Sequence, residues 1–133
     1  MESKLLSMKE AVERYVLNSS SVAMSTYMEQ LIVYAAAHEI IRQRRKNLTL
    51  IGPISDLLFD QLIGAGCVSE VKAAWVGNVM MGSAYQFRRA VEEGVPNKIK
   101  MTDYSNLTMA LALHAAAFGC RFCLPGQRSE AIY

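Results

Sequence analysis

The sequence predicts an α/β fold with an open, mostly parallel sheet and helices on both faces, in three α/β/α layers. Strand-like segments alternate with helical segments along the chain, which is the order that βαβ crossovers require. The strand-like segments are apolar runs without clean alternation, as expected of strands that helices cover on both faces. Hydrophobic residues make up 52% of the 133 residues, which suggests either a sheet covered on both faces or a surface that binds a partner.

Capping signals place the helices. An S-x-x-E box begins at Ser7 and an S-x-x-Q box at Ser83. Ser55 or Asp56 caps the third helix, and Ser105 caps a long alanine-rich one. Glycines close the last three helices. The expected helices span residues 7–16, 30–45, 55–64, 83–94 and 105–119. The expected strands span residues 21–25, 47–51, 71–76, 99–102 and 121–124.

We expect one domain over residues 1–124, followed by a polar tail over residues 125–133. The net charge is only +2, so nothing favours nucleic acid as a partner. No apolar run reaches the roughly 18 residues of a membrane span. The N-terminus is amphipathic and lacks the apolar core of a signal peptide. These features predict a cytoplasmic protein.

Several common site motifs are missing from the sequence. Cys120 and Cys123 form a lone C-x-x-C, whereas tetrahedral zinc needs four ligands, so we interpret the cysteines as reduced and structural. The loop G-x-x-x-x-G-S at residues 77–83 lacks the lysine of a P-loop. Neither a dinucleotide-binding G-x-G-x-x-G nor a G-x-S-x-G nucleophile elbow is present. We therefore expect no metal and no tightly bound cofactor.

Functional loops of an open α/β sheet lie beyond the carboxyl ends of its strands. Three loops meet this rule, at residues 25–29, 77–83 and 103–106. Each runs into a helix, whose free backbone N–H groups can hold an anion or a carbonyl oxygen.

Other polar and aromatic residues have two interpretations each. Trp75 flanks the second loop, where it could pack on an acyl chain or adenine, although an aromatic there more often fills the core. Asp56 and Asp60 lie four apart on one helix and could do acid–base work, but such a pair is usually a solvated face. The basic run at residues 42–46 is either an anion site or a helix end that complements the dipole.

Residues 8–117 resemble the A (alpha) subunit of family I coenzyme A transferases. The resemblance is carried by the pieces AAHEIIRQ, NLTLIGPISDLLFDQLIGAGCV, FRRAVEEG with the loop before it, and DYSNLTMAL. It implies an enzyme that moves CoA between an acyl-CoA and a free carboxylic acid by ping-pong exchange. A glutamate carboxylate attacks the acyl-CoA carbonyl, and a glutamyl-CoA thioester then carries the CoA.

The resemblance also implies how the site is divided between chains. The glutamate belongs to a separate B (beta) subunit in heteromeric members, and no S-E-N-G-like segment occurs here, so this chain would hold no catalytic residue. It would supply a wall of the site for the CoA thioester substrate. The candidate wall residues are Asn78, Gly82, Ser83, Tyr104, Ser105 and Asn106. Thr26 and Tyr27 are candidates for an oxyanion loop, although the family usually has glycine there.

Family subunits are longer than this chain, which suggests the N-terminal half of such a subunit. An incomplete sheet would expose an edge, so we expect a hetero-oligomer when the B subunit is present and self-association when the chain is alone. Two alternatives stay open. One is a truncated, non-catalytic subunit that only binds partners; the other is a subunit of a related acyl-CoA ring-opening hydrolase.

Overall fold

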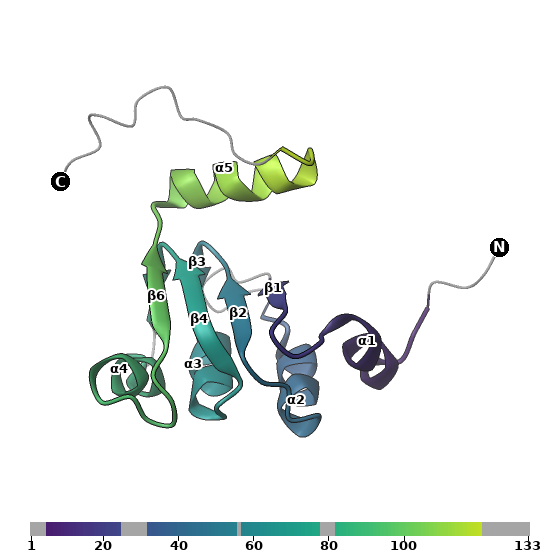
Figure 1. Cartoon of the computed structure of the whole chain (residues 1–133), viewed down its shortest axis with the longest axis horizontal. Helices are drawn as coiled ribbons and strands as arrows, with labels where there is room; N and C mark the ends of the chain where they lie inside the picture. The colour runs from purple at the N-terminus through teal and green to yellow at the C-terminus, as the bar shows by residue number, and fades with distance from the viewer. Residues whose placement is uncertain (1–4, 25–31, 56, 78–81, 121–133) are drawn as a thin grey trace.

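The computed structural model describes residues 5–24, 32–55, 57–77 and 82–120. These residues form helices around a parallel sheet, with the last helix beyond one end of the strands (Figure 1). The helices are α1 (Met8–Tyr15), α2 (Tyr34–Arg42), α3 (Leu57–Gly64), α4 (Tyr85–Glu92) and α5 (Asn106–Ala117). The strands are β1 (Ser21–Ala23), β2 (Leu48–Ile51), β3 (Ile54–Ser55), β4 (Val68–Ala73), β5 (Trp75–Val76) and β6 (Lys100–Asp103).

The main sheet has four parallel strands in the order β1-β2-β4-β6. The α/β class with a parallel sheet is thus confirmed. The chain bends after β2 and again after β4, and the continuations β3 and β5 pair in parallel as a second, two-stranded sheet. The single strand expected at residues 71–76 is therefore two strands, because β4 begins at Val68 and the pairing changes sheet after Ala73.

The strand order puts the crossover helices on one face of the main sheet. Each crossover moves in the same direction across the sheet, and right-handed crossovers then place their helices on the same side. Figure 1 shows α2, α3 and α4 on that common side. Strand residues facing these helices are buried; they include Leu48, Leu50, Val71 and Ala73. Residues that alternate with them are partly exposed and mostly polar; they include Thr49, Ile51, Glu70 and Lys72.

Within the described residues, the layer formed by α2, α3 and α4 covers one face of the main sheet. The opposite face carries a cross-strand network in which Glu70 accepts from Lys100 Nζ and from Thr102 Oγ1, both at 2.9 Å. The lysine bond is the main reason that the pKa of Glu70 lies below its ordinary value.

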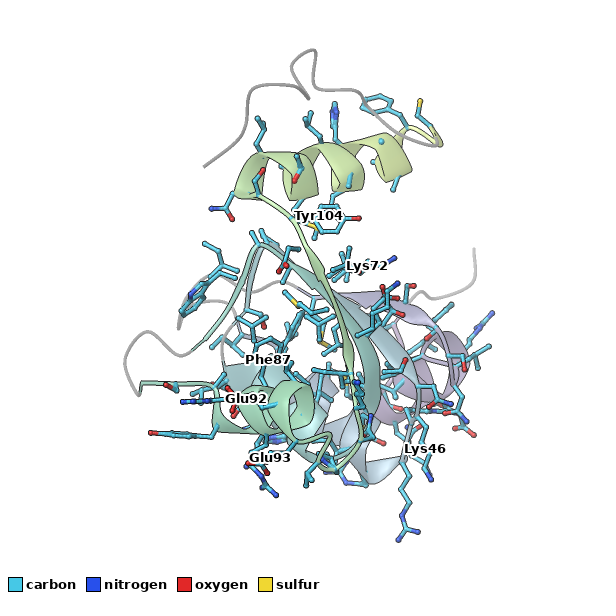
Figure 2. All side chains as sticks on the ribbon, turned by 60° about the vertical axis from the view of Figure 1, so that its left-hand side comes forward. Lys46, Lys72, Phe87, Glu92, Glu93 and Tyr104 are labelled. Atoms are coloured by element: carbon cyan, nitrogen blue, oxygen red, sulfur yellow. The ribbon has the colours of Figure 1, made fainter. Side chains whose placement is uncertain are left out.

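Helix α3 forms the centre of the core. Its residues Leu58, Phe59, Leu62 and Ile63 are all buried and belong to one cluster with the inward residues of β2 and β4. Neighbouring side chains from α2 and α4 join the same cluster through Ile40 and Ala90. Figure 2 shows the side chains filling this space, with α5 and Tyr104 lying apart from it.

The caps of the first and last helices agree with the sequence. Ser7 and Glu10 cap each other's backbone at the start of α1. Ser105 Oγ accepts the Thr108 amide at the start of α5, and Thr108 Oγ1 accepts the Ser105 amide. Of the two residues expected to cap α3, Asp56 lies outside the described residues, and Ser55 belongs to β3 with its hydroxyl buried.

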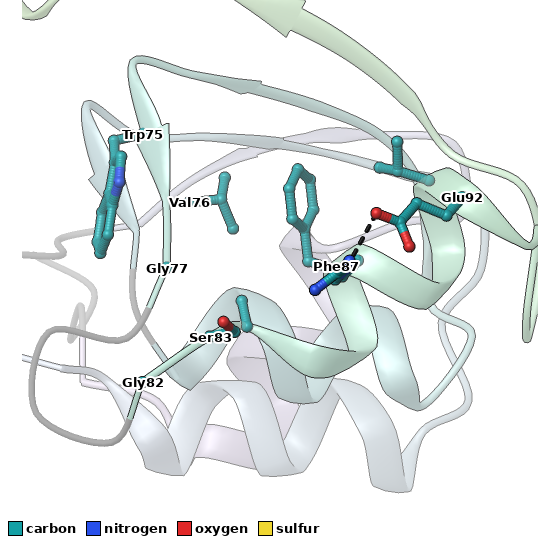
Figure 3. A pocket seen from close by; sticks show the side chains of 10 residues that line it. Trp75, Val76, Gly77, Gly82, Ser83, Phe87 and Glu92 are labelled. Atoms are coloured by element: carbon teal, nitrogen blue, oxygen red, sulfur yellow. Dashed lines mark hydrogen bonds and ion pairs between the residues drawn. The ribbon is translucent and has the colours of Figure 1, made fainter.

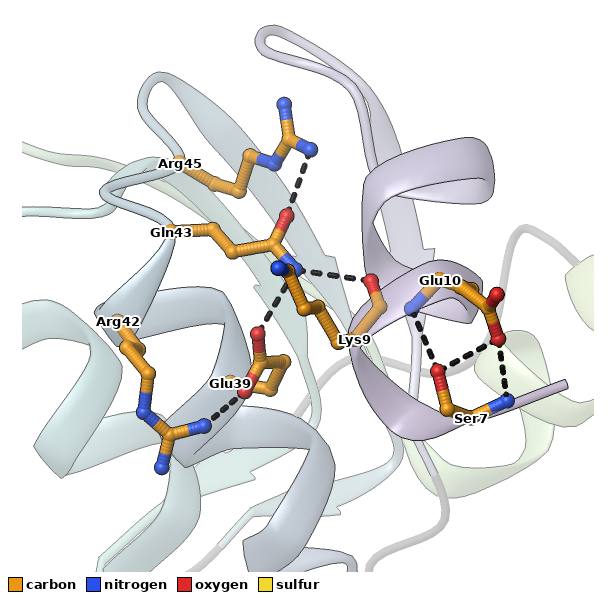
Figure 4. A network of polar contacts seen from close by, with 7 residues as sticks. All are labelled: Ser7, Lys9, Glu10, Glu39, Arg42, Gln43 and Arg45. Atoms are coloured by element: carbon orange, nitrogen blue, oxygen red, sulfur yellow. Dashed lines mark hydrogen bonds and ion pairs between the residues drawn. The ribbon is translucent and has the colours of Figure 1, made fainter.

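A polar network fastens α1 to α2 (Figure 4). Gln43 Nε2 donates to the Lys9 carbonyl at 2.9 Å and to Glu39 Oε1 at 2.8 Å. Glu39, only 4% exposed, also pairs with Arg42. Arg45 donates to Gln43 Oε1 at 2.8 Å. Two cations of the basic run thus have structural partners at the end of α2.

Candidate functional site

The described parts of the predicted loops lie at the carboxyl ends of the strands. Thr26 and Tyr27 of the first loop, and Asn78 of the second, lie outside the described residues. The second loop is described at Gly77, which follows β5, and at Gly82 and Ser83, which precede α4.

A pocket lies between β5 and α4, with a volume of about 410 Å³ (Figure 3). The three described residues of the second loop line it. Its complete lining consists of Trp75, Val76, Gly77, Gly82, Ser83, Ala84, Phe87, Arg88, Val91 and Glu92. Aliphatic and aromatic groups dominate the walls, and the polar groups are one hydroxyl and one ion pair. Such a lining suits a largely uncharged ligand.

Trp75 forms one wall and is held by its neighbour in the loop. A Cβ on Gly77 would lie 2.2 Å from Trp75 Cζ2, so the indole ring lies directly against the glycine backbone. Only glycine permits this approach. Trp75 is 43% exposed, so the interpretation of this aromatic as a core residue is wrong.

Helix α4 forms the opposite wall. Ala84, Phe87, Arg88 and Val91 follow the i, i+3, i+4, i+7 pattern of one helix face. Glu92 joins them by accepting from Arg88 Nε at 2.9 Å. These residues were not among the predicted site residues, although their helical spacing beside the glycine loop is a usable signal.

The start of α4 differs from the prediction. The N-cap is Ala84, and no side chain of its own segment caps the helix, so the expected Ser83–Gln86 box does not form. Asp60 of α3 takes this role: its Oδ1 accepts the Phe87 amide at 2.8 Å. Burial raises the pKa of Asp60, while bonds from the Phe87 and Gln86 amides oppose the rise. Asp60 is therefore not part of a freely solvated face.

The third loop lies on the neighbouring strand end and does not line this pocket. The Tyr104 amide donates to the Ala73 carbonyl at 3.0 Å, which extends the pairing of β6 with β4. Ser105 is occupied as the cap of α5. Asn106 is exposed at the first turn of that helix. The structure thus brings Gly82 and Ser83 into one pocket and leaves Tyr104, Ser105 and Asn106 outside it.

No group of three or more histidine, cysteine, aspartate or glutamate side chains within the described residues could hold a metal ion. Nor is any helix in those ranges long and apolar enough to cross a membrane.

Comparison with known proteins gives named relatives. The chain is 41% identical over 121 residues to the A subunit of the 3-oxoadipate CoA-transferase of Pseudomonas knackmussii, covering 91% of this chain and 43% of that protein. It is 32% identical to the A subunit of the glutaconate CoA-transferase of Acidaminococcus fermentans, covering 90% and 37%. No family model matches the chain. The resemblance seen in the sequence is thereby confirmed.

Solved structures show the same architecture. The glutaconate CoA-transferase of Acidaminococcus fermentans superposes with a TM-score of 0.82 at 31% identity, over 94% of this chain and 40% of that one. A variant of the decarboxylase AibA/AibB superposes with a TM-score of 0.78 at 23% identity, over 86% and 44%, and supports the fold alone. The chain spans less than half the length of each of these proteins.

Proposed function

Because the chain is homologous to CoA-transferase A subunits over about nine-tenths of its length, we propose that it acts as an A-type subunit of a CoA-transferase. It would form one wall of the acyl-CoA site. The observation that carries this proposal is the pocket itself. The loop at residues 77–83 was predicted from the sequence to be functional. Its residues Gly77, Gly82 and Ser83 line one cavity together with Trp75 and Phe87.

The lining favours the thioester and pantetheine part of acyl-CoA over its phosphates. Trp75, Phe87 and Val91 offer apolar surface to a methylene chain. The Ser83 hydroxyl can bond to an amide or carbonyl group. Arg88 already pairs with Glu92, which leaves little net charge to attract a phosphate.

The nucleophilic glutamate would come from a separate B subunit. Of the described glutamates, Glu39 is buried and bonded to Arg42 and Gln43, and Glu70 is bonded on the polar face of the sheet. Glu92 alone of these three lines the pocket. A Glu92→Gln variant that retains exchange in the complex supports a nucleophile on the partner. Loss of exchange with intact acyl-CoA binding would place the nucleophile in this chain.

Helix α5 is a candidate partner surface. Most of its residues are apolar, and Leu107, Leu113 and the C-cap residue Phe118 are 64%, 38% and 71% exposed. Exposed apolar groups on one helix favour association. We expect the isolated chain to self-associate through α5, and light scattering at micromolar concentration measures this. A Leu107→Glu/Phe118→Glu variant should shift the population toward monomer; unchanged scattering would remove α5 from the interface.

Binding is tested by intrinsic fluorescence, because Trp75 is the single tryptophan of the chain. Acetyl-CoA should change the emission in a saturable way, whereas 3′,5′-ADP, which lacks the pantetheine arm, should not. Ser83→Ala should weaken acetyl-CoA binding about fivefold to tenfold, the loss of one hydrogen bond. Ser21→Ala, on the distant strand β1, is the matched control. Equal titrations with both nucleotides would count against the proposed pocket.

Activity is tested with the chain alone and after co-expression with a B-type subunit. Exchange of label from acetyl-CoA into a second carboxylic acid should appear only in the complex. Free CoA, measured chromatographically, separates the alternatives: its net release without a second acid indicates a hydrolase. A stable complex without either activity would favour the non-catalytic alternative.

A further inference from the structure

The first turn of α4 is capped from a different helix. Asp60 Oδ1 accepts the Phe87 amide at 2.8 Å, and the backbone N–H groups of Phe87 and Gln86 both act to lower the pKa of this carboxyl. Helix N-termini normally receive such bonds from the residue just before the helix. Here that residue is Ala84, which has no side chain able to cap. The residues just before α4, which line the pocket, therefore do not cap this helix.

A second contact fixes the same two elements. Gly64 lies four residues after Asp60, on the same stripe of α3. A Cβ on Gly64 would lie 2.8 Å from Gln86 Cγ, so α3 and the start of α4 are in close contact. Asp60 and Gly64 together set the position of the α4 turn relative to the core helix α3.

The cap has two consequences for the pocket. The amide of Phe87 is taken by a carboxylate, so it cannot receive a phosphate or a substrate carboxylate. The Ser83 hydroxyl is not used as a cap and lies at the pocket wall (Figure 3). It can therefore bond to a ligand.

We propose that Asp60 is a positioning residue that makes this pocket selective for a neutral group. Its carboxylate excludes anions from the start of α4, holds Phe87 in the wall and leaves Ser83 to bind an amide or carbonyl oxygen. The ligand part that enters is thus the uncharged pantetheine arm with its thioester. The identity of that ligand rests on the proposed function, whereas the positioning of α4 by Asp60 does not.

The test compares Asp60→Ala and Asp60→Asn, with Asp103→Ala as a matched control at an exposed aspartate of β6. Pantetheine and 3′,5′-ADP serve as neutral and anionic probes, followed by Trp75 fluorescence. In Asp60→Ala, pantetheine affinity should fall about tenfold and 3′,5′-ADP affinity should rise, because the α4 amides become free. Asp60→Asn keeps an acceptor oxygen and should bind pantetheine within about twofold of the wild type.

Hydrogen exchange of the Phe87 amide reads out the positioning independently of any ligand. This amide should exchange faster in Asp60→Ala, and Asp60→Asn should restore most of the protection. Unchanged exchange in Asp60→Ala would overturn the positioning role. If Asp60→Ala binds pantetheine normally and still excludes 3′,5′-ADP, the proposed role of Asp60 in selectivity is wrong. Absence of pantetheine and acetyl-CoA binding in the wild type, with the exchange result intact, would refute the proposed function and leave the positioning role standing.

Discussion

Replacing Gly77 with alanine is expected to expel Trp75 from its position. The new Cβ would lie 2.2 Å from Trp75 Cζ2 and 2.4 Å from Cη2, and atoms cannot remain at such distances. The φ of Gly77 does not lie in the left-handed region, so alanine brings no backbone strain. The whole effect should therefore pass through the indole ring.

The magnitude follows from the burial of that ring. Trp75 is 43% exposed, so somewhat more than half of its surface is buried. A tryptophan buries roughly 150–250 Å², and at about 25 cal/mol per Å² the buried part corresponds to about 2–3.5 kcal/mol. The displaced ring will keep some contacts, so we expect the free energy of unfolding to fall by about 1–3 kcal/mol.

Urea unfolding followed by circular dichroism gives this energy, and the native fluorescence should shift toward the emission of a solvated indole. A double-mutant cycle with Trp75→Ala isolates the contact. Once the ring is absent, the Gly77→Ala substitution should cost little. An equal loss of stability in both backgrounds would show that the contact between the two residues is not the cause.

Three further predictions concern single side chains. The lowered pKa of Glu70 means that its stabilisation is present above about pH 4.5 and is lost as the pH falls through the folded pKa, so Glu70→Gln should remove this dependence from urea unfolding. The pKa of Asp60 is raised, so its effect on stability runs the other way with pH. The contribution of Asp60 to the free energy of unfolding is present below about pH 3.8 and is lost as the pH rises through the folded pKa. Asp60→Asn should therefore gain stability relative to wild type as the pH rises through that range. Ser105→Ala should lower the free energy of unfolding by about 1 kcal/mol without changing acetyl-CoA affinity, because Ser105 caps α5 outside the pocket.

Local signals in the sequence predicted most of the elements. The capping box at Ser7, the cap at Ser105 and the alternation of strands and helices depend on neighbouring residues, and the structure contains them. The sequence did not predict which face of the sheet α2, α3 and α4 would cover. The covered face depends on the direction of successive crossovers, which the spacing of segments does not encode. Nor does strand propensity mark the exposed face, because residues on it such as Thr49 and Ile51 are good strand formers too.

For the candidate site, too, local signals could be predicted from the sequence and long-range contacts could not. Gly82 and Ser83 could be chosen because strand ends and glycines mark functional loops. The role of Asp60 could not, because a residue more than twenty positions earlier caps α4 and the local S-x-x-Q pattern at Ser83 suggested a simpler cap. Long-range contacts of this kind replace local ones only once the helices have packed.

The order β1-β2-β4-β6 follows the order of the chain. Each strand of the main sheet therefore pairs with the main-sheet strand made just before it, and within the described residues no strand has to be inserted between two that are already paired. A chain emerging from the ribosome can add one strand and one helix at a time to an existing edge. The pairing partners are separated by a single crossover, which keeps loop closure short and favours rapid assembly. Within the described residues the last strand added in this direction is β6, from which the chain enters α5.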